Sequence, residues 1–218
     1  MDYGSAFVHM FSYEGWGKKL VLGVAMSLTP VLGPIVLMGW ALDVLRNMAK
    51  GDANPLPAWT GDDFARWLGR GLGLSVAVLT FLLPVIVVLM IIYVCGFIGV
   101  AVIGDDSEGL TNVYALCMAC LGFILYFLVG LGALVVFVRY ASTDRLDVGL
   151  DYAKTFQLVS QNLAQLLIIV ILVFIMAIAA VILGTLTLGI LFLFMPVYFS
   201  LVLAYFGAQL SKQPGFTD

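Results

Sequence analysis

The sequence predicts an all-α integral membrane protein whose helices cross a bilayer several times. Of its 218 residues, 63% are hydrophobic and 11% are charged, and the mean hydropathy is +1.12. A soluble domain is about 45–50% apolar and about 25% charged, and a soluble fold of this length could not bury so much apolar surface. The apolar residues come in long runs, whereas a membrane barrel needs short alternating strands. Helices satisfy their own backbone hydrogen bonds in lipid, so these runs predict helices.

The first 17 residues predict a short amphipathic helix in the membrane interface. Phe7, Met10 and Phe11 fall at helical spacing, and the basic pair Lys18 and Lys19 follows them. A short helix with one apolar face is typical of segments that lie on a membrane rather than across it.

The first apolar run covers residues 20–45 and is broken in its middle. Pro30, Gly33 and Pro34 stand within five residues, which favours a turn over a single kink. Each arm reaches about 15 Å at 1.5 Å per residue, about half of the ~30 Å hydrocarbon core. The run therefore predicts either a re-entrant hairpin or one kinked fifth span, and the short arms favour the hairpin.

Residues 46–71 predict a cytoplasmic loop. Pro55 and Pro57 force extended or turn geometry, and Trp59 stands beside them. The end of this segment, residues 62–70, carries the aromatic and arginine residues typical of the start of an interfacial helix.

The remaining apolar runs predict four full transmembrane helices within a single membrane domain. They cover residues 72–103, 110–138, 166–183 and 190–210. The first exceeds the ~20 residues that a span needs and contains Pro84, so we expect it to tilt, kink or project beyond the membrane. Gly122, Gly130 and Gly132 let membrane helices approach closely, which favours tight packing or a homo-oligomer.

The basic residues predict the orientation in the membrane. The ten Lys and Arg residues are Lys18, Lys19, Arg46, Lys50, Arg66, Arg70, Arg139, Arg145, Lys154 and Lys212. The turns at residues 105–109 and 184–189 contain none of them. Because loops rich in Lys and Arg face the cytoplasm, we expect a cytoplasmic C-terminus in the cytoplasmic (inner) membrane. A re-entrant first run would place the N-terminus and all ten cations on that side as well.

Residue types that carry catalysis do not gather in this sequence. His9 is the sole histidine and has no carboxylate or cysteine beside it, so it predicts no metal site. Cys117 and Cys120 have CxxC spacing but stand in an apolar run, where cysteine acts as a small hydrophobic residue. Phosphate-loop, dinucleotide-binding, zinc-protease and nucleophile-elbow motifs are missing. We therefore expect no catalytic, cofactor-binding or metal site, and a protein that is not an enzyme.

Asp43 is the one ionisable residue set well into an apolar run. A charge inside a membrane is costly and marks a candidate functional residue. Arg46 and Asn47 lie three and four residues further on, on the same helix face. The favoured interpretation is therefore a locally paired residue near the cytoplasmic interface, and the alternative is a functional site.

Several short motifs resemble a prokaryotic family of multi-pass membrane proteins. They are Trp16–Leu20, Thr29–Pro34, Gly39-Trp40, Arg46-Asn47, Lys50-Gly51, Pro55–Trp59 and, near the end of the chain, Gly207–Gln209. The family is known as domain of unknown function 4013, and the specific motifs lie in the first third of the chain. The resemblance implies a protein of the bacterial or archaeal cytoplasmic membrane and brings no activity, ligand or catalytic residues. Trp40 stands where the family has tyrosine.

Two functions are compatible with these observations. The favoured one is a non-catalytic subunit or scaffold of a larger membrane assembly. The alternative is a small-molecule or lipid transporter or channel built from a duplicated unit: Asp2-Tyr3 with Phe7 is echoed by Asp151-Tyr152 with Phe156, and duplicated halves are common in transporters. The expected partners are membrane lipids and other membrane proteins or further copies of the chain. Nucleic acid is not expected, because the net charge is −3.

Overall fold

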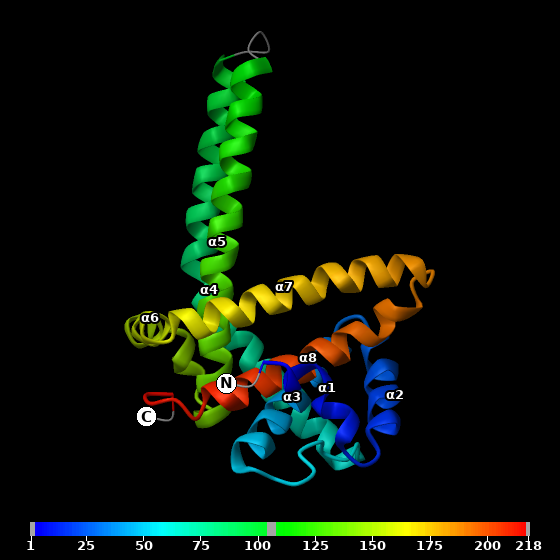
Figure 1. The fold of residues 1–218 in the computed structure, drawn as a ribbon. Coiled ribbons are helices and arrows are strands. Elements are labelled where there is room, and N and C mark those ends of the chain that lie inside the picture. The colour runs from blue at the N-terminus through cyan, green and yellow to red at the C-terminus, as the bar shows by residue number, and fades with distance from the viewer. Residues whose placement is uncertain (1–2, 104–107, 217–218) are drawn as a thin grey trace.

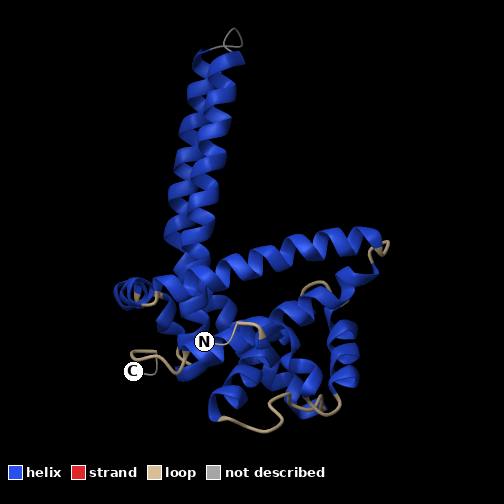
Figure 2. Ribbon diagram, in the orientation of Figure 1, coloured by secondary structure: helices blue, strands red, loops and turns tan. Residues whose placement is uncertain are grey.

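The computed structural model describes residues 3–103 and 108–216, and the regular elements in these ranges are all helices (Figure 1; Figure 2). In chain order they are α1 (Ser5–Val8), the 3-10 helix η1 (His9–Ser12), α2 (Trp16–Ser27), α3 (Leu32–Lys50), α4 (Gly61–Ile103), α5 (Glu108–Thr143), the 3-10 helix η2 (Leu146–Gly149), α6 (Tyr152–Gln161), α7 (Leu163–Leu186) and α8 (Ile190–Leu210). The predicted all-helical architecture is confirmed. Most of the acidic turn at residues 105–109 lies outside the described residues.

Within the described residues, four helices are long and apolar enough to cross a membrane: α4, α5, α7 and α8. They coincide with the four runs that the sequence singles out. The helix α4 has 43 residues, which at 1.5 Å per residue is about 65 Å, about twice the ~30 Å of a hydrocarbon core. A helix of that length extends well beyond the lipid or lies strongly tilted in it.

The helices α4 and α5 form one long antiparallel hairpin with two unlike parts (Figure 1). Its base, residues 61–81 and 131–143, packs against α3, η2, α6 and α8 and buries side chains from both helices. Its arm, residues 89–103 and 108–122, projects clear of the other helices (Figure 1). None of the side chains described for the arm is buried. One helix pair thus carries both a packed and an unpacked region.

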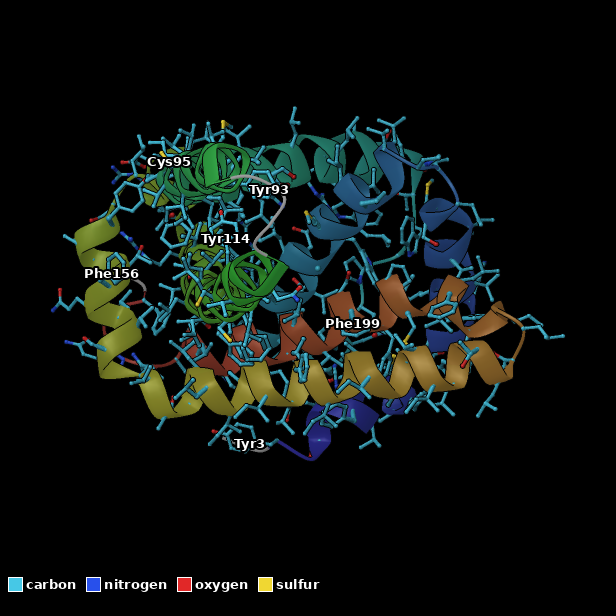
Figure 3. All side chains as sticks on the ribbon, turned by 90° about the horizontal axis from the view of Figure 1, so that it is seen from above. Tyr3, Tyr93, Cys95, Tyr114, Phe156 and Phe199 are labelled. Atoms are coloured by element: carbon cyan, nitrogen blue, oxygen red, sulfur yellow. The ribbon has the colours of Figure 1, made fainter. Side chains whose placement is uncertain are left out.

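The helices α7 and α8 form a second apolar hairpin, which lies crosswise to the first (Figure 1). Figure 3, which looks along the first hairpin, shows α7 and α8 side by side along one side of it. They turn at Thr187–Gly189, where Gly189 has φ +89°, a left-handed conformation that glycine adopts without strain. The two apolar hairpins therefore leave the rest of the chain in different directions, which hydropathy alone does not predict.

The helix α3 lies at the centre of the packed part of the molecule. It contacts α2, α4, α5 and α8. Apart from Met38, every residue from Val36 to Leu45 is buried. A helix that is covered on all sides belongs to the core, so the only acidic residue in this stretch, Asp43, is placed in a dry environment.

The first apolar run divides into two helices, as its prolines predict. The turn occupies residues 28–31, with Pro30 inside it, and Pro34 falls in the first turn of α3, where its missing N–H is harmless. Gly33 packs against the carbonyl oxygen of Met26 so closely that a Cβ would overlap it. The two helices contact each other, and α2 also contacts α8.

The loop after the first run is shorter than the predicted segment of residues 46–71. The helix α3 continues to Lys50 and ends at Gly51, which has φ +81°, and α4 begins at Gly61. Thr60 caps this start, because its hydroxyl accepts from the Asp63 N–H at 3.4 Å and donates to the Asp63 carboxylate. Residues 62–70 are therefore the first turns of α4 itself instead of a separate helix, and Arg66, Trp67 and Arg70 among them contact α3.

Pro84 lies within α4 without ending the helix. A proline inside a helix leaves the carbonyl four residues earlier without its usual N–H donor, here the carbonyl of Thr80. The hydroxyl of Tyr152 donates to that oxygen at 2.8 Å. A side chain of α6 thus replaces the missing backbone donor, which is how membrane helices accommodate proline.

Candidate functional site

The helices α3 and α4 cross with their backbones in contact. A Cβ at Gly39 would overlap the carbonyl oxygen of Trp67, and one at Gly71 would overlap that of Ile35. Two glycines, one on each helix, therefore set the closest point of the crossing. Asp43 lies one helical turn beyond Gly39 on the same face, so the crossing delivers it to α4.

Asp43 accepts hydrogen bonds from three side chains of α4. The guanidinium Nη1 of Arg70 lies 2.5 Å from Oδ1, and Nη2 of Arg66 lies 3.0 Å from Oδ2. The indole Nε1 of Trp67 donates to Oδ2 at 2.8 Å. Asp43 is 7% exposed and Trp67 is fully buried, so this carboxylate is held in the core by its partners.

The cluster around Asp43 continues as a chain of alternating charges. Asp144 lies 2.6 Å from the Arg46 guanidinium and 3.8 Å from that of Arg70. At the other end, Arg66 lies 2.7 Å from Asp63. Within the described residues the chain holds three carboxylates and three guanidinium groups, so it is neutral. We call these six residues, Asp63, Arg66, Asp43, Arg70, Asp144 and Arg46, the charge network.

The charge network joins three segments of the chain. Asp43 and Arg46 come from α3, and Arg66 and Arg70 come from α4. Asp144 directly follows α5 in a left-handed conformation, with φ 54°. Arg46 also donates from Nε to the carbonyl of Ala141, near the end of α5, at 2.6 Å. The network therefore fixes the ends of α3 and α5 against the start of α4.

The chemistry that this geometry allows is structural. A carboxylate that accepts from two guanidinium groups and an indole has little capacity left for a ligand. Removing one member of a buried ion pair typically costs about 3–5 kcal/mol, because the partner keeps an uncompensated charge. The side chains of Arg66 and Arg70 are 47% and 31% exposed, so the network is buried in its middle, at Asp43, and reaches the surface through the arginine on either side.

A second ion pair holds α6 to α5. Arg139, 6% exposed, places Nη2 2.8 Å from Oδ2 of Asp151 and Nη1 3.5 Å from the hydroxyl of Thr155. Asp151 also caps α6 by accepting from the Lys154 N–H at 3.2 Å. The hydrogen bond from Arg139 is the main reason that the pKa of Asp151 lies below its usual value.

Residues 21–191, which contain both ion-pair sites, match one protein family described as "Protein of unknown function (DUF4013)". The chain belongs to this family. The match confirms the resemblance that the motifs indicate and extends it from α2 to the start of α8. No curated protein and no solved structure matches the chain. The DUF4013 region thus includes the complete charge network, whereas His9 and Lys212 lie outside it.

In this DUF4013 chain, Asp43 is paired, but with partners other than those nearest in sequence. Local spacing favours Arg46 and Asn47. The structure instead gives Asp43 to Arg66 and Arg70, while Arg46 turns toward Asp144 and Asn47 donates to the carbonyl of Pro55 at 3.1 Å. Partners on α4 replace the partners expected on the same helix, because the close helix crossing brings two guanidinium groups within reach of one carboxylate.

The proline-rich loop completes the wall around Asp43. Trp59 lies between Trp40 and Trp67, with ring centroids 5.6 Å and 5.0 Å apart. Lys19 of α2 donates to the carbonyl of Leu56, between Pro55 and Pro57. The extended loop thereby packs Trp59 against one tryptophan of α3 and one of α4, next to the residues that surround Asp43.

The histidine and cysteine residues considered above for metal or redox chemistry do not belong to the charge network. Among the described residues, no cluster of histidine, cysteine and acidic side chains is suited to hold a metal ion. His9 is buried, with Nδ1 2.9 Å from the carbonyl of Ala6, and burial lowers its pKa. Cys95, Cys117 and Cys120 are free thiols exposed on the arm, with Cys95 labelled in Figure 3.

Sequence reasoning missed that Arg66 and Arg70 are the partners of Asp43. A signal was available, since these two arginines stand four residues apart and therefore share one helix face. That face also carries Trp67 beside them, in a chain with few charges. An arginine pair on one helix and a lone acid on the preceding apolar helix together indicate an ion pair between the helices.

Proposed function

We propose that this protein is a non-catalytic subunit or scaffold of a larger assembly in the cytoplasmic membrane. The observation that carries the proposal is the contrast within the α4–α5 hairpin. Its base is fixed to the other helices by the charge network, and its arm presents apolar side chains such as Met90 (60% exposed), Tyr93 (65%) and Leu116 (66%) outward. A rigidly mounted apolar helix pair suits the docking of further transmembrane helices.

The crosswise direction of α7 supports the same function. Because α7 leaves the hairpin instead of packing along it, the two sides of the arm stay uncovered by this chain (Figure 1). Membrane helices associate through close packing of apolar and small side chains. The arm carries Gly109 and Gly122, where an added Cβ would meet open space, so a partner helix can approach its backbone there.

The surroundings of Asp43 argue against the transport alternative. A carrier that moves an ion or proton needs its intramembrane acid to face a water-filled path. Asp43 instead faces two arginines and a tryptophan that occupy its oxygens. One cavity of about 390 Å³ lies between α5, α7 and α8, and its lining is apolar, with Phe127, Phe174 and Phe199 among its side chains. It therefore offers no site for an ion, and the flux measurement below tests transport of lipid.

The proposal includes the topology that the basic residues predict. All ten cations lie on the cytoplasmic side, and α2 and α3 form a re-entrant hairpin rather than a kinked span. A re-entrant backbone must be covered by protein. The contacts of α2 with α3 and α8, and the hydrogen bond from Ser27 to the carbonyl of Leu193 at 3.4 Å, cover one side of α2. The turn at residues 28–32 is exposed in this chain, so under this proposal the partner subunits cover it.

The test is site-specific photo-cross-linking of the full chain in its native membrane. Benzoylphenylalanine replaces Tyr93 on the arm, an exposed aromatic residue. The matched control replaces Phe81 of the base, which is 6% exposed and close in size. Irradiation followed by mass spectrometry then identifies what lies against each position.

The expected result is a discrete protein adduct at position 93, formed by a different membrane protein or by a second copy of the chain, and none at position 81. Adducts with lipid alone at position 93 would overturn the proposal. Solute or lipid flux across vesicles that contain only this purified chain would favour the transport alternative instead.

A further inference from the structure

A hollow of about 480 Å³ opens where the last turns of α3, α5 and α8 converge, beside the charge network. Its cationic side chains are Arg46 and Lys50 from α3 and Lys212 from just beyond α8. Asp144 is the one carboxylate among its lining residues. The lining therefore carries a net charge of +2, in a chain whose total charge is −3.

The three cationic side chains of this hollow differ in whether they already have a partner. Arg46 forms an ion pair with Asp144 and donates a hydrogen bond to the carbonyl of Ala141. Lys50 and Lys212 are exposed, and within the described residues neither forms an ion pair. Lysines near helix C-termini are favoured by the helix dipole, which accounts for their positions but not for the hollow between them.

The shape and lining of the hollow favour one class of ligand. Leu45, Ala49 and Ala141 supply an apolar wall next to the two lysines. A free inorganic anion has no apolar part that could contact this wall. A phospholipid has one, because its phosphate is joined directly to an apolar glycerol ester. Basic pockets between membrane helices on the cytoplasmic side bind anionic headgroups in this way.

We propose that this hollow binds the phosphate headgroup of an anionic phospholipid from the cytoplasmic leaflet. Lys50 and Lys212 contact the phosphate oxygens, and the apolar wall receives the glycerol backbone. Asp144, held by Arg46 and Arg70, keeps the neighbouring arginines away from the phosphate, so the two lysines determine the affinity. This inference rests on the cytoplasmic placement of this face given under the proposed function.

The test measures lipid selectivity of the full chain reconstituted in phosphatidylcholine vesicles. Spin-labelled phosphatidylglycerol and spin-labelled phosphatidylcholine are added in separate samples, and the motionally restricted fraction of each is recorded. We expect a preference for phosphatidylglycerol that Lys50→Gln together with Lys212→Gln reduces. Each lysine near the surface contributes about 1 kcal/mol. The binding constant for phosphatidylglycerol relative to phosphatidylcholine should therefore fall about 5-fold for one substitution and about 25-fold for both.

The matched control is Lys18→Gln together with Lys154→Gln, which removes the same charge from other segments of the chain. An equal loss of preference in both double variants overturns the proposal, since general surface charge would then explain the effect. A preference that 10 mM inorganic phosphate abolishes, at constant ionic strength, also overturns it and identifies a free-anion site. Retention of the preference in the phosphate arm and in the control variant supports the phospholipid.

A separate measurement distinguishes failure of this site from failure of the proposed topology. In a chain whose native cysteines are replaced by serine, Lys50→Cys is labelled with a membrane-impermeant maleimide in intact cells. Protection in intact cells and labelling after lysis place this face in the cytoplasm. Labelling in intact cells contradicts the topology and the cytoplasmic-leaflet source of the lipid, whatever the vesicle assay shows.

Discussion

The base and the arm of the α4–α5 hairpin belong to the same two helices but have opposite environments. In the base, close glycine crossings and buried ion pairs fix α4 against α3, with Asp43 only 7% exposed. In the arm, none of the described side chains is buried, and the two helices lie beside each other and clear of the rest of the chain. The base gives the chain its own stability, whereas the arm contributes little to it and is available to the surroundings.

The largest expected effect follows from Asp43→Ala in the base. The substitution removes the carboxylate that Arg66 and Arg70 share and leaves the buried Trp67 indole without its acceptor. Because the two arginines are partly exposed and keep Asp63 and Asp144 nearby, we expect a cost of about 3 kcal/mol, the lower end of the range for a buried pair. Thermal unfolding in detergent, followed by tryptophan fluorescence, measures it. Asp62→Ala, an exposed acid in the first turn of α4, is the control and should change stability by less than about 1 kcal/mol.

A companion variant tests whether the network acts by pairing. Replacing Asp43, Arg66 and Arg70 together with methionine removes all of the charges at the crossing. Stability should then exceed that of Asp43→Ala, since apolar groups replace such pairs at little cost. It should stay below that of the native chain by about 1–3 kcal/mol, because the buried Trp67 indole N–H loses its acceptor. A triple variant as unstable as Asp43→Ala would show that these side chains have a role beyond mutual neutralisation.

The next effect concerns the helix crossing. Gly71→Ala places a Cβ into the carbonyl oxygen of Ile35 and should destabilise the chain by about 1–3 kcal/mol. Gly69→Ala, two residues earlier on α4, meets open space and should raise stability by up to about 1 kcal/mol, because alanine is the better helix former. Two identical substitutions with opposite signs would establish the backbone contact, and the same sign for both would refute it.

Tyr152→Phe should have a smaller effect at the boundary of the base. It removes the hydroxyl that donates to the carbonyl of Thr80, which Pro84 leaves without a backbone donor. Because this hydrogen bond is only part-buried, its loss should cost about 1 kcal/mol. Tyr152→Phe combined with Pro84→Ala restores the backbone donor and should recover most of the loss. Equal stability of the single and double variants would contradict this account.

The pair of Arg139 and Asp151 should give a small, pH-dependent effect. Because the folded chain lowers the pKa of Asp151 below its ordinary 3.8, the pair stabilises above that pH and its contribution disappears as pH falls through the folded value. The side chain of Asp151 is 40% exposed, so we expect about 1 kcal/mol or less. The native chain should melt at a higher temperature than Asp151→Asn by a constant difference from pH 5 to 7. This difference should shrink as the pH falls below 4.

The smallest effect is expected in the arm. Leu116→Ala should change stability in detergent by no more than about 0.5 kcal/mol, as for an exposed site. Leu131→Ala, the same substitution on the same helix but 2% exposed in the base, should cost about 2–5 kcal/mol. A large loss from Leu116→Ala would show that the arm is part of the stable core.

The sequence predicts features that depend on composition and local spacing. Long apolar runs predict α4, α5, α7 and α8, and the cluster of Pro30 and Pro34 predicts the division of the first run. The partners of Asp43 escape such reasoning, because helical spacing compares only residues on one helix, and the true partners come from the next. The direction of α7 likewise depends on packing at its ends, which hydropathy does not encode.

The separation in sequence between Asp43 and its partners has a consequence for biosynthesis. Arg66 and Arg70 follow Asp43 by 23 and 27 residues, and a chain emerges from the ribosome N-terminus first. Until α4 is made, the unpaired charge on Asp43 opposes insertion of α3 into lipid, by an amount that reaches about 2.5–3.5 kcal/mol for an acid at the centre of a helix. We therefore expect α3 to wait at the membrane surface and to enter together with α4, so that the two helices are delivered as a pair rather than one at a time.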